Sequence, residues 1–298
     1  MQVATRAAHA ASVERLSGLQ RDIDTLQGQI GTGKRIAVPS DAPVGSGIVT
    51  RLRRAQDSGI AAGRSVDTAV SRLAATDVAL AGVSEVVQRA REVALLGATG
   101  TLNAADRATL AATAVQLGEQ LLELANTRAA DGTSLFGGAL GQGDAFVRGP
   151  AGVVVWAGVG GAPVLALGSG TVSAGIDGRA ALTGPAGDAF ALLDALNLAL
   201  AAPDAARSVA MASVLTGLEA SVSLVADTRA TVGTRQTRLE AEAERLKVVD
   251  LAMEKDLSKI EGIDLPTAIA RVQRLITVLQ AAQASFVKIT SLSFWDRL

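Results

Sequence analysis

The chain has 298 residues, enough for two domains, and its formal net charge of -1 leaves no basic footprint for nucleic acid. It contains no cysteine and one histidine, which excludes disulfides and thiolate metal sites and gives little support to a histidine-ligated metal. Aromatic residues make up 2% of the chain and tyrosine is absent. Packing must therefore depend on Leu, Val, Ile and Ala, which suits long helices better than a bulky core.

The first predicted element is a helix over residues 12–30. Its apolar residues recur at alternating three- and four-residue steps, a pattern typical of a helix that packs one face on a partner. This seam consists of Leu16, Leu19, Ile23, Leu26 and Ile30. The residues before it lack a basic stretch followed by an apolar block and a cleavage site, so we expect no cleaved signal peptide.

Residues 31–43 interrupt this helix with glycine and proline. Gly28, Gly33 and Lys34 fit the spacing of a phosphate-binding loop. Three observations count against that loop. Arg35 stands where a hydroxyl should face magnesium, the preceding residues have a helical period, and no alternation of strand and helix follows. The sequence favours a structural loop, and a nucleotide site over residues 28–34 is the remote alternative.

Residues 45–126 have a helical period in three pieces. We expect helices over residues 47–63 and 64–96 and, after a turn, a third helix that Asn103 or Asp106 can cap. The short link predicts that the two longer helices lie antiparallel. The first piece carries a basic cluster, which is either a solvated face or a contact for an acidic neighbouring subunit. The cluster consists of Arg51, Arg53 and Arg54.

Residues 129–187 differ in composition, because glycine rises, charge falls and β-branched residues gather. We predict a small β-rich insertion in which Trp156 is a packing residue. Its strands are expected near residues 146–148, 153–157, 163–167 and 171–174. No charge lies between Arg148 and Asp177, but glycine and proline break that segment too often for a spanning helix, so we expect no membrane partner.

Two further helices are expected after the insertion, over residues 188–200 and 203–260. The second holds a seven-residue apolar pattern, formed by Leu215, Leu218, Val222, Val225, Val232, Leu239, Ala243, Leu246 and Met253. Gly217 and Gly233 each cost about 1 kcal/mol relative to alanine, which a helix of this length tolerates.

The last predicted helix covers residues 265–294. Asp264 can cap its start, and Pro266 lies in its first turn, where a missing N–H is harmless. Its seam consists of Val272, Leu275, Leu279, Ala282, Phe286 and Ile289. Alone in water such a helix gains little from its seam, so we expect it to pack on the helix of residues 12–30.

The predicted fold class is mainly α. We expect a long antiparallel helical coiled-coil rod, formed by the N- and C-terminal arms, with a small β-rich inserted domain. Residues 1–46 and 262–298 would form a terminal helical assembly core. Residues 47–130 and 186–261 would form a helical rod domain, and residues 131–185 the β-rich inserted domain.

Catalytic chemistry has little support in the sequence. His9 is the only histidine in the sequence, so it is the only candidate for the base of a Ser/His/Asp triad, and a triad cannot be assembled with any alternative histidine. Carboxylate pairs such as Glu240 and Glu244 lie on a charged helix face beside cations, where nothing raises their pKa by burial. We expect no catalytic, cofactor or metal site, and therefore no enzyme.

Several motifs resemble the flagellin-like axial proteins of bacteria. On the N-terminal side they are residues 26–36, 39–43, 73–77, 90–92, 103–107 and 124–128, and on the C-terminal side residues 232–235, 238–240 and 258–265. Residues 131–138 and 291–298 are further similar to the hook-associated protein 3 family, which forms the hook–filament junction. Asp41 and Ala42 stand where that family often has two aspartates, and Arg297 stands where it often has an aromatic residue. An atypical flagellin filament subunit is the alternative.

The resemblance implies a structural role outside the cell. Such proteins are exported through the flagellar type III channel without a cleaved signal and then add to the distal hook. The implied partners are further copies of the chain, the hook-side and filament-side axial proteins, and an export chaperone at the C-terminal helix; no cofactor is implied. The two ends are expected to be poorly ordered alone and to fold together on polymerisation. The expected assembly interface is Leu16, Leu19, Ile23, Leu26 and Ile30 against Val272, Leu275, Leu279, Phe286 and Ile289.

Overall fold

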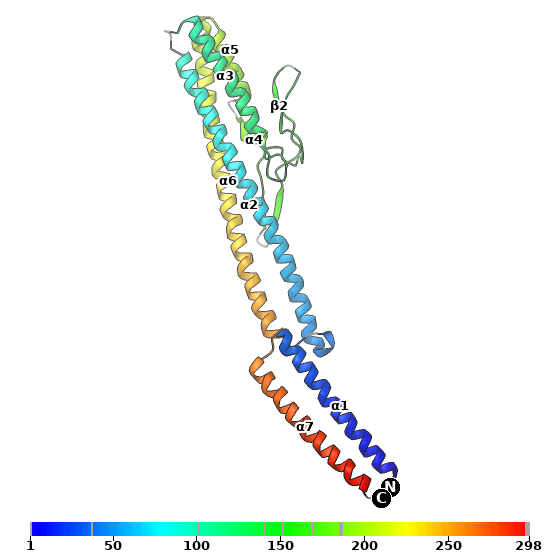
Figure 1. Cartoon of the computed structure of the whole chain (residues 1–298). Coiled ribbons are helices and arrows are strands. Elements are labelled where there is room, and N and C mark those ends of the chain that lie inside the picture. Colours follow the sequence, from blue (N-terminus) through cyan, green and yellow to red (C-terminus); the bar gives the residue numbers. More distant parts are fainter. Residues whose placement is uncertain are drawn as a thin grey trace. The chain divides into compact units, whose positions relative to one another are not determined.

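The computed structural model describes residues 2–36, 38–99, 102–139, 141–150, 152–167, 170–184 and 187–295, without the side chains of residues 2–8, 39, 204–205 and 289–295. In these ranges the helices are α1 (Gln2–Thr32), the 3-10 helix η1 (Pro39–Asp41), α2 (Pro43–Gly97), α3 (Ala104–Ala125), α4 (Gly178–Leu182), α5 (Ala189–Ala201), α6 (Asp204–Glu261) and α7 (Leu265–Trp295). The strands are β1 (Phe146–Arg148), β2 (Val154–Trp156), β3 (Val164–Leu167), β4 (Gly170–Ser173), β5 (Thr183–Gly184) and β6 (Gly187–Asp188). The predicted fold class, with long helices and a small β-rich insertion, is confirmed (Figure 1).

The chain divides into two compact units. The terminal unit consists of residues 1–59 and 248–298, and the central unit consists of residues 60–247. Helices α2 and α6 contribute residues to both units. The three-part domain division expected from the sequence stays a prediction.

In the terminal unit, α1 and α7 form an antiparallel pair. They lie side by side, and both chain ends are at the same end of the pair (Figure 1). There the rings of His9 and Phe286 have centroids 4.8 Å apart, while at the other end Lys34 forms an antiparallel bridge with Gly262. Helix α1 begins at Gln2, earlier than the predicted residue 12, because the added turns are rich in alanine, the best helix former.

The central unit holds the main hydrophobic core, between α2, α3, α5 and α6. The largest fully buried side chains that these four helices contribute are Leu73, Leu80, Leu121, Leu196, Leu200, Met211, Leu218 and Leu239. The Asn103 side chain caps α3 by accepting the Asp106 N–H at 2.8 Å, as predicted. Across the pair of long helices, Arg229 on α6 donates to Asp77 on α2 at 2.9 Å. The predicted break between residues 63 and 64 is wrong, because α2 continues without interruption through Gly63. No neighbouring side chain packs against Gly63 at the position where a Cβ would lie.

The insertion consists of antiparallel hairpins. Among the described residues β1 pairs with β2, β3 with β4 and β5 with β6, so the predicted strands are present within about one residue at each end. Trp156 is partly buried and donates its Nε1–H to the Phe136 carbonyl at 3.0 Å, which agrees with a packing role. Arg72 on α2 donates to the Thr133 hydroxyl and Arg235 on α6 to the Gly175 carbonyl, so helical arginines hold loops of the insertion.

Helix α6 contains one strongly apolar window. By length and composition alone, its residues 206–261 contain a window that could cross a membrane, and 33% of that window is buried in the protein. A core helix of a multi-helix bundle meets the same criterion. The sequence analysis rejected a spanning helix over residues 148–177 in favour of short strands, and the structure forms hairpins there.

Candidate assembly interface

The two terminal helices pack along the apolar seam predicted from the sequence. Ile23 on α1 and Val272 on α7 are its most buried members, at 7% and 8% exposure. The other described members are half-buried: Leu16, Leu19, Leu26, Ile30, Leu275, Leu279, Ala282 and Phe286. The side chain of Ile289 lies outside the described residues. The structure thus brings the two halves of the seam together, and their role in assembly stays a prediction.

The register of the pair follows from the contacts at its two ends. Since partner numbers there add to nearly the same value, Leu16 lies at about the level of Leu279, and Ile23 at about the level of Val272. The best-buried positions of the two helices therefore face each other near the middle of the seam.

Large apolar side chains remain exposed beside this seam. They are Val13 on α1 and Leu265, Ile269, Val278 and Val287 on α7. In the terminal unit as described, the buried apolar side chains are few: Ile23, Ile36, Val49, Ala268 and Val272. A helix pair with so thin a core leaves much of its apolar surface in water, which is the property of a surface completed by a partner.

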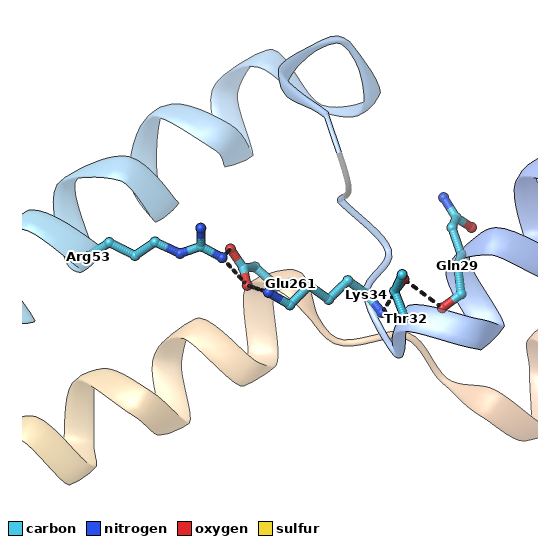
Figure 2. A network of polar contacts seen from close by, with 5 residues as sticks. All are labelled: Gln29, Thr32, Lys34, Arg53 and Glu261. Carbon is cyan, nitrogen blue, oxygen red and sulfur yellow. Dashed lines mark hydrogen bonds and ion pairs between the residues drawn. The ribbon is translucent and has the colours of Figure 1, made fainter.

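An ion-pair cluster lies at the inner end of the terminal pair, where α1 and α6 end (Figure 2). Glu261, the last residue of α6, is buried to 8% exposure. Both of its carboxylate oxygens accept from Arg53 on α2, at 2.6 and 2.9 Å. Lys34, in the loop after α1, places its Nζ 3.5 Å from the same carboxylate. Figure 2 shows the two cations reaching Glu261 from separate segments of the chain.

Hydrogen bonds also join the loop that follows α1 to the loop that follows α6. The Arg35 N–H donates to the Glu261 carbonyl at 2.6 Å, and the Ile263 N–H donates to the Gly33 carbonyl at 3.1 Å. The Arg35 guanidinium donates to the Ile260 carbonyl at 2.9 Å. Gly33 has φ of 69°, which favours glycine because a Cβ there would be strained. The loops after α1 and after α6 are therefore joined by both backbone and side-chain contacts.

The sequence reasoning missed this cluster. It left Arg53 between a solvated face and a contact with a neighbouring subunit, and the structure instead pairs it within the chain. A signal was present, because Glu261 is an acidic residue at a helix C-terminus, where the helix dipole disfavours negative charge unless cations neutralise it. Arg51 and Arg54 are exposed, so the solvated reading holds for them in the isolated chain.

The geometry also disfavours the nucleotide alternative. Gly28 lies inside α1, so the amides of residues 28–32 belong to a helix rather than to a phosphate cradle. Lys34, the residue that would reach the phosphates, pairs with Glu261. Among the residues whose side chains are described, no group of three or more His, Asp or Glu side chains gathers as a metal site would require.

Both helical regions of the chain match models of a known protein family. A family model for the bacterial flagellin N-terminal helical region matches residues 3–140, and one for the bacterial flagellin C-terminal helical region matches residues 215–293. The flagellar hook-associated protein 3 of Escherichia coli (strain K12) is 26% identical over 317 aligned positions, covering 99% of both chains. That of Salmonella typhimurium is 29% identical over 140 residues, which cover 46% of this chain and 44% of the relative.

Solved structures share the fold at low identity. A putative flagellar hook-associated protein from Vibrio parahaemolyticus is 20% identical, with a TM-score of 0.69 over 74% of this chain and 100% of that one. FlgL from Xanthomonas campestris is 15% identical, with a TM-score of 0.63 over 70% of this chain and 99% of that one. At these identities the likeness establishes the fold alone. Together with the two family matches, which cover most of the sequence, it leads to one conclusion: this chain belongs to the bacterial flagellin family of axial proteins.

Proposed function

We propose that the chain is a structural subunit of the bacterial flagellum that assembles at the distal hook, forms the hook–filament junction and supports filament growth. The family membership supports a place among the axial proteins. The relative matched along almost its whole length is a flagellar hook-associated protein 3, which supports the junction rather than the filament.

The observation that carries the proposal is the half-buried seam of α1 and α7. Fully burying a Leu, Ile or Phe side chain contributes roughly 1.5–3 kcal/mol, so each half-buried member still has roughly 1 kcal/mol to gain. Summed over the seam and the exposed apolar residues beside it, this gain is large enough to drive association of copies. We expect the terminal helices of neighbouring copies of the chain to bury this surface.

The remaining parts of the proposal concern partners and route. The chain would contact further copies of itself in a ring or helical array, a hook-side protein below and a filament-side protein above. It would reach the outside of the cell through the flagellar type III channel without a cleaved signal. The amphipathic face of α7 suits an export chaperone that binds a helix in a groove. The role is structural, with no catalytic step and no cofactor.

Imaging cells that lack the protein tests this function. Cells without it should carry hooks but no filaments, and expression of the wild-type chain should restore the filaments. Normal filaments on the deleted strain would contradict the junction role.

The behaviour of the purified protein distinguishes a junction protein from a flagellin filament subunit. A junction protein should not form long filaments by itself, whereas a filament subunit should. Electron microscopy of the concentrated protein distinguishes them, and long filaments would favour the alternative.

A further inference from the structure

We propose that the β-rich insertion contacts the insertion of a neighbouring copy of the chain. In this contact the outer face of the β1–β2 hairpin of one copy packs on the outer face of the β3–β4 hairpin of the next. The inference rests on the proposed function, which supplies the neighbour, but the surface lies in the central unit and involves neither α1 nor α7.

The outer face of the β1–β2 hairpin consists of exposed valines. Val147 on β1 is the cross-strand partner of Val155 on β2, so their side chains lie on the same face. The Gly149 N–H donates to the Val153 carbonyl at 2.8 Å, which continues the ladder and places Val153 on that face as well. The three valines are between 39% and 52% exposed, whereas Val154, which alternates with them, is buried on the opposite face.

The β3–β4 hairpin has a second outer face of the same kind. Val164 on β3 pairs with Ser173 on β4, and Ala166 pairs with Thr171. Val164 is 61% exposed, and Ala166 and Thr171 are exposed too. Leu165, which alternates with them, packs against the core of the central unit. One insertion therefore carries two different uncharged faces, one on each hairpin.

These faces lack the charged side chains with which proteins usually guard open strands against another chain. No charge lies between Arg148 and Asp177 in the sequence, and Arg148 itself pairs with Glu119 on α3. Within the described residues each hairpin is a sheet of two strands, so its outer edges are open. An uncharged, valine-rich β surface with open edges has the character of a surface that another chain covers.

The size of the two faces indicates which partner covers them. Each face exposes at most a few hundred square ångströms of side chain, well below the about 800 Å² per partner that a stable complex of free proteins buries. A contact this small forms between molecules that other contacts already hold together, where the effective concentration is high. Copies of the chain in an array meet that condition. Because successive copies in such an array have the same orientation, the contact joins two different faces, one from each copy.

The chain contains no cysteine, so cross-linking of introduced cysteines maps the contact directly. The experiment co-expresses two single variants, Val155→Cys and Val164→Cys, in cells that lack the wild-type chain. Isolated flagella are treated with a short bismaleimide, and the chain is detected by immunoblotting. We expect dimers when both variants are present and at least ten-fold fewer when either variant is expressed alone.

Three results would overturn the contact. The mixture could give no dimers, or Val155→Cys alone could give as many dimers as the mixture, which would mean that like faces meet. The third is an equal dimer yield from a control mixture of Val155→Cys and Val209→Cys, because Val209 is 74% exposed on α6, outside both faces.

A charge placed in the contact tests its burial. Val147→Asp, added to the Val155→Cys chain, puts an unpaired carboxylate between the two faces and should lower the dimer yield of the mixture by about ten-fold or more. Val209→Asp in the same chain is the matched control and should leave the yield unchanged. Circular dichroism of the purified variants shows whether each keeps its helices. Equal yields from the two variants would refute the contact.

This inference and the proposed function fail separately. If the mixture gives no dimers in cells that carry normal filaments, the contact is wrong and the junction role stands. If cells that lack the whole chain keep their filaments, the junction role is wrong, whereas dimers from any array that the chain forms would still support the contact.

Discussion

Replacing Leu279 with aspartate tests the seam at its most informative position. Leu279 is half-buried in the isolated chain and lies at about the level of Leu16 on α1. In the monomer the new carboxylate can still reach water, so the central unit should stay folded. In a polymer that covers this side of α7, an unpaired carboxylate costs about 4 kcal/mol per subunit, which weakens association by about a thousand-fold.

The assay is the fraction of hooks that carry filaments in cells expressing Leu279→Asp, with circular dichroism of the purified variant. Gln280→Asp is the matched control, because it adds the same charge and the same helix-propensity change at an exposed neighbouring position. The variant should fail to assemble and the control should assemble. Normal assembly of Leu279→Asp, or equal failure of Gln280→Asp, would show that the seam is not the interface.

Three further predictions concern the central unit. Gly233→Ala should raise its thermal midpoint by about 2 °C, because the site is open, whereas Gly217→Ala should lower it, because the new Cβ would lie 2.3 Å from a Leu192 methyl; melting by circular dichroism compares the two, and equal shifts would refute the packing argument. Leu196→Ala should cost about 2–5 kcal/mol in urea unfolding, since this side chain is fully buried, and a loss below 1 kcal/mol would argue against that burial. Burial raises the pKa of Asp188, so the folded chain keeps this proton to higher pH than the unfolded chain, and stability falls as the pH rises from the ordinary carboxyl pKa through the raised one. Asp188→Asn keeps the cap of α5 but should remove the contribution of this group to the loss of stability. The urea midpoint of the variant should therefore depend less on pH than that of the wild type between about pH 3.5 and 7. An unchanged pH dependence would contradict the raised pKa of Asp188.

Local signals predicted the elements of this fold well. Asn103 marks the start of α3 because its side chain can satisfy a free N–H, and β1 has the predicted bounds because charge and glycine delimit it. The break at Gly63 was wrong for a physical reason. One glycine costs about 1 kcal/mol, and α2 offsets that through the buried Val66 and Leu73 on its following turns.

The candidate site was harder to predict than the helices. Periodicity identified both halves of the seam, since each is a local pattern, and even suggested that they pair. The Glu261 cluster joins residues more than two hundred positions apart, as the pairing with Arg53 shows. No local pattern encodes that separation, so only the folded chain reveals why an acidic residue ends α6.

The tryptophans of the chain, one of them fixed by the hydrogen bond from Trp156 to the Phe136 carbonyl, provide an intrinsic fluorescent probe. The chain has two tryptophans and no tyrosine, so its near-ultraviolet emission comes from Trp156 in the insertion and from Trp295, the last residue of α7. In a Trp156→Phe chain the remaining fluorescence would originate from the C-terminal helix alone. Stopped-flow emission or quenching by iodide could then follow, without any attached dye, the moment at which that helix is taken up by its neighbours.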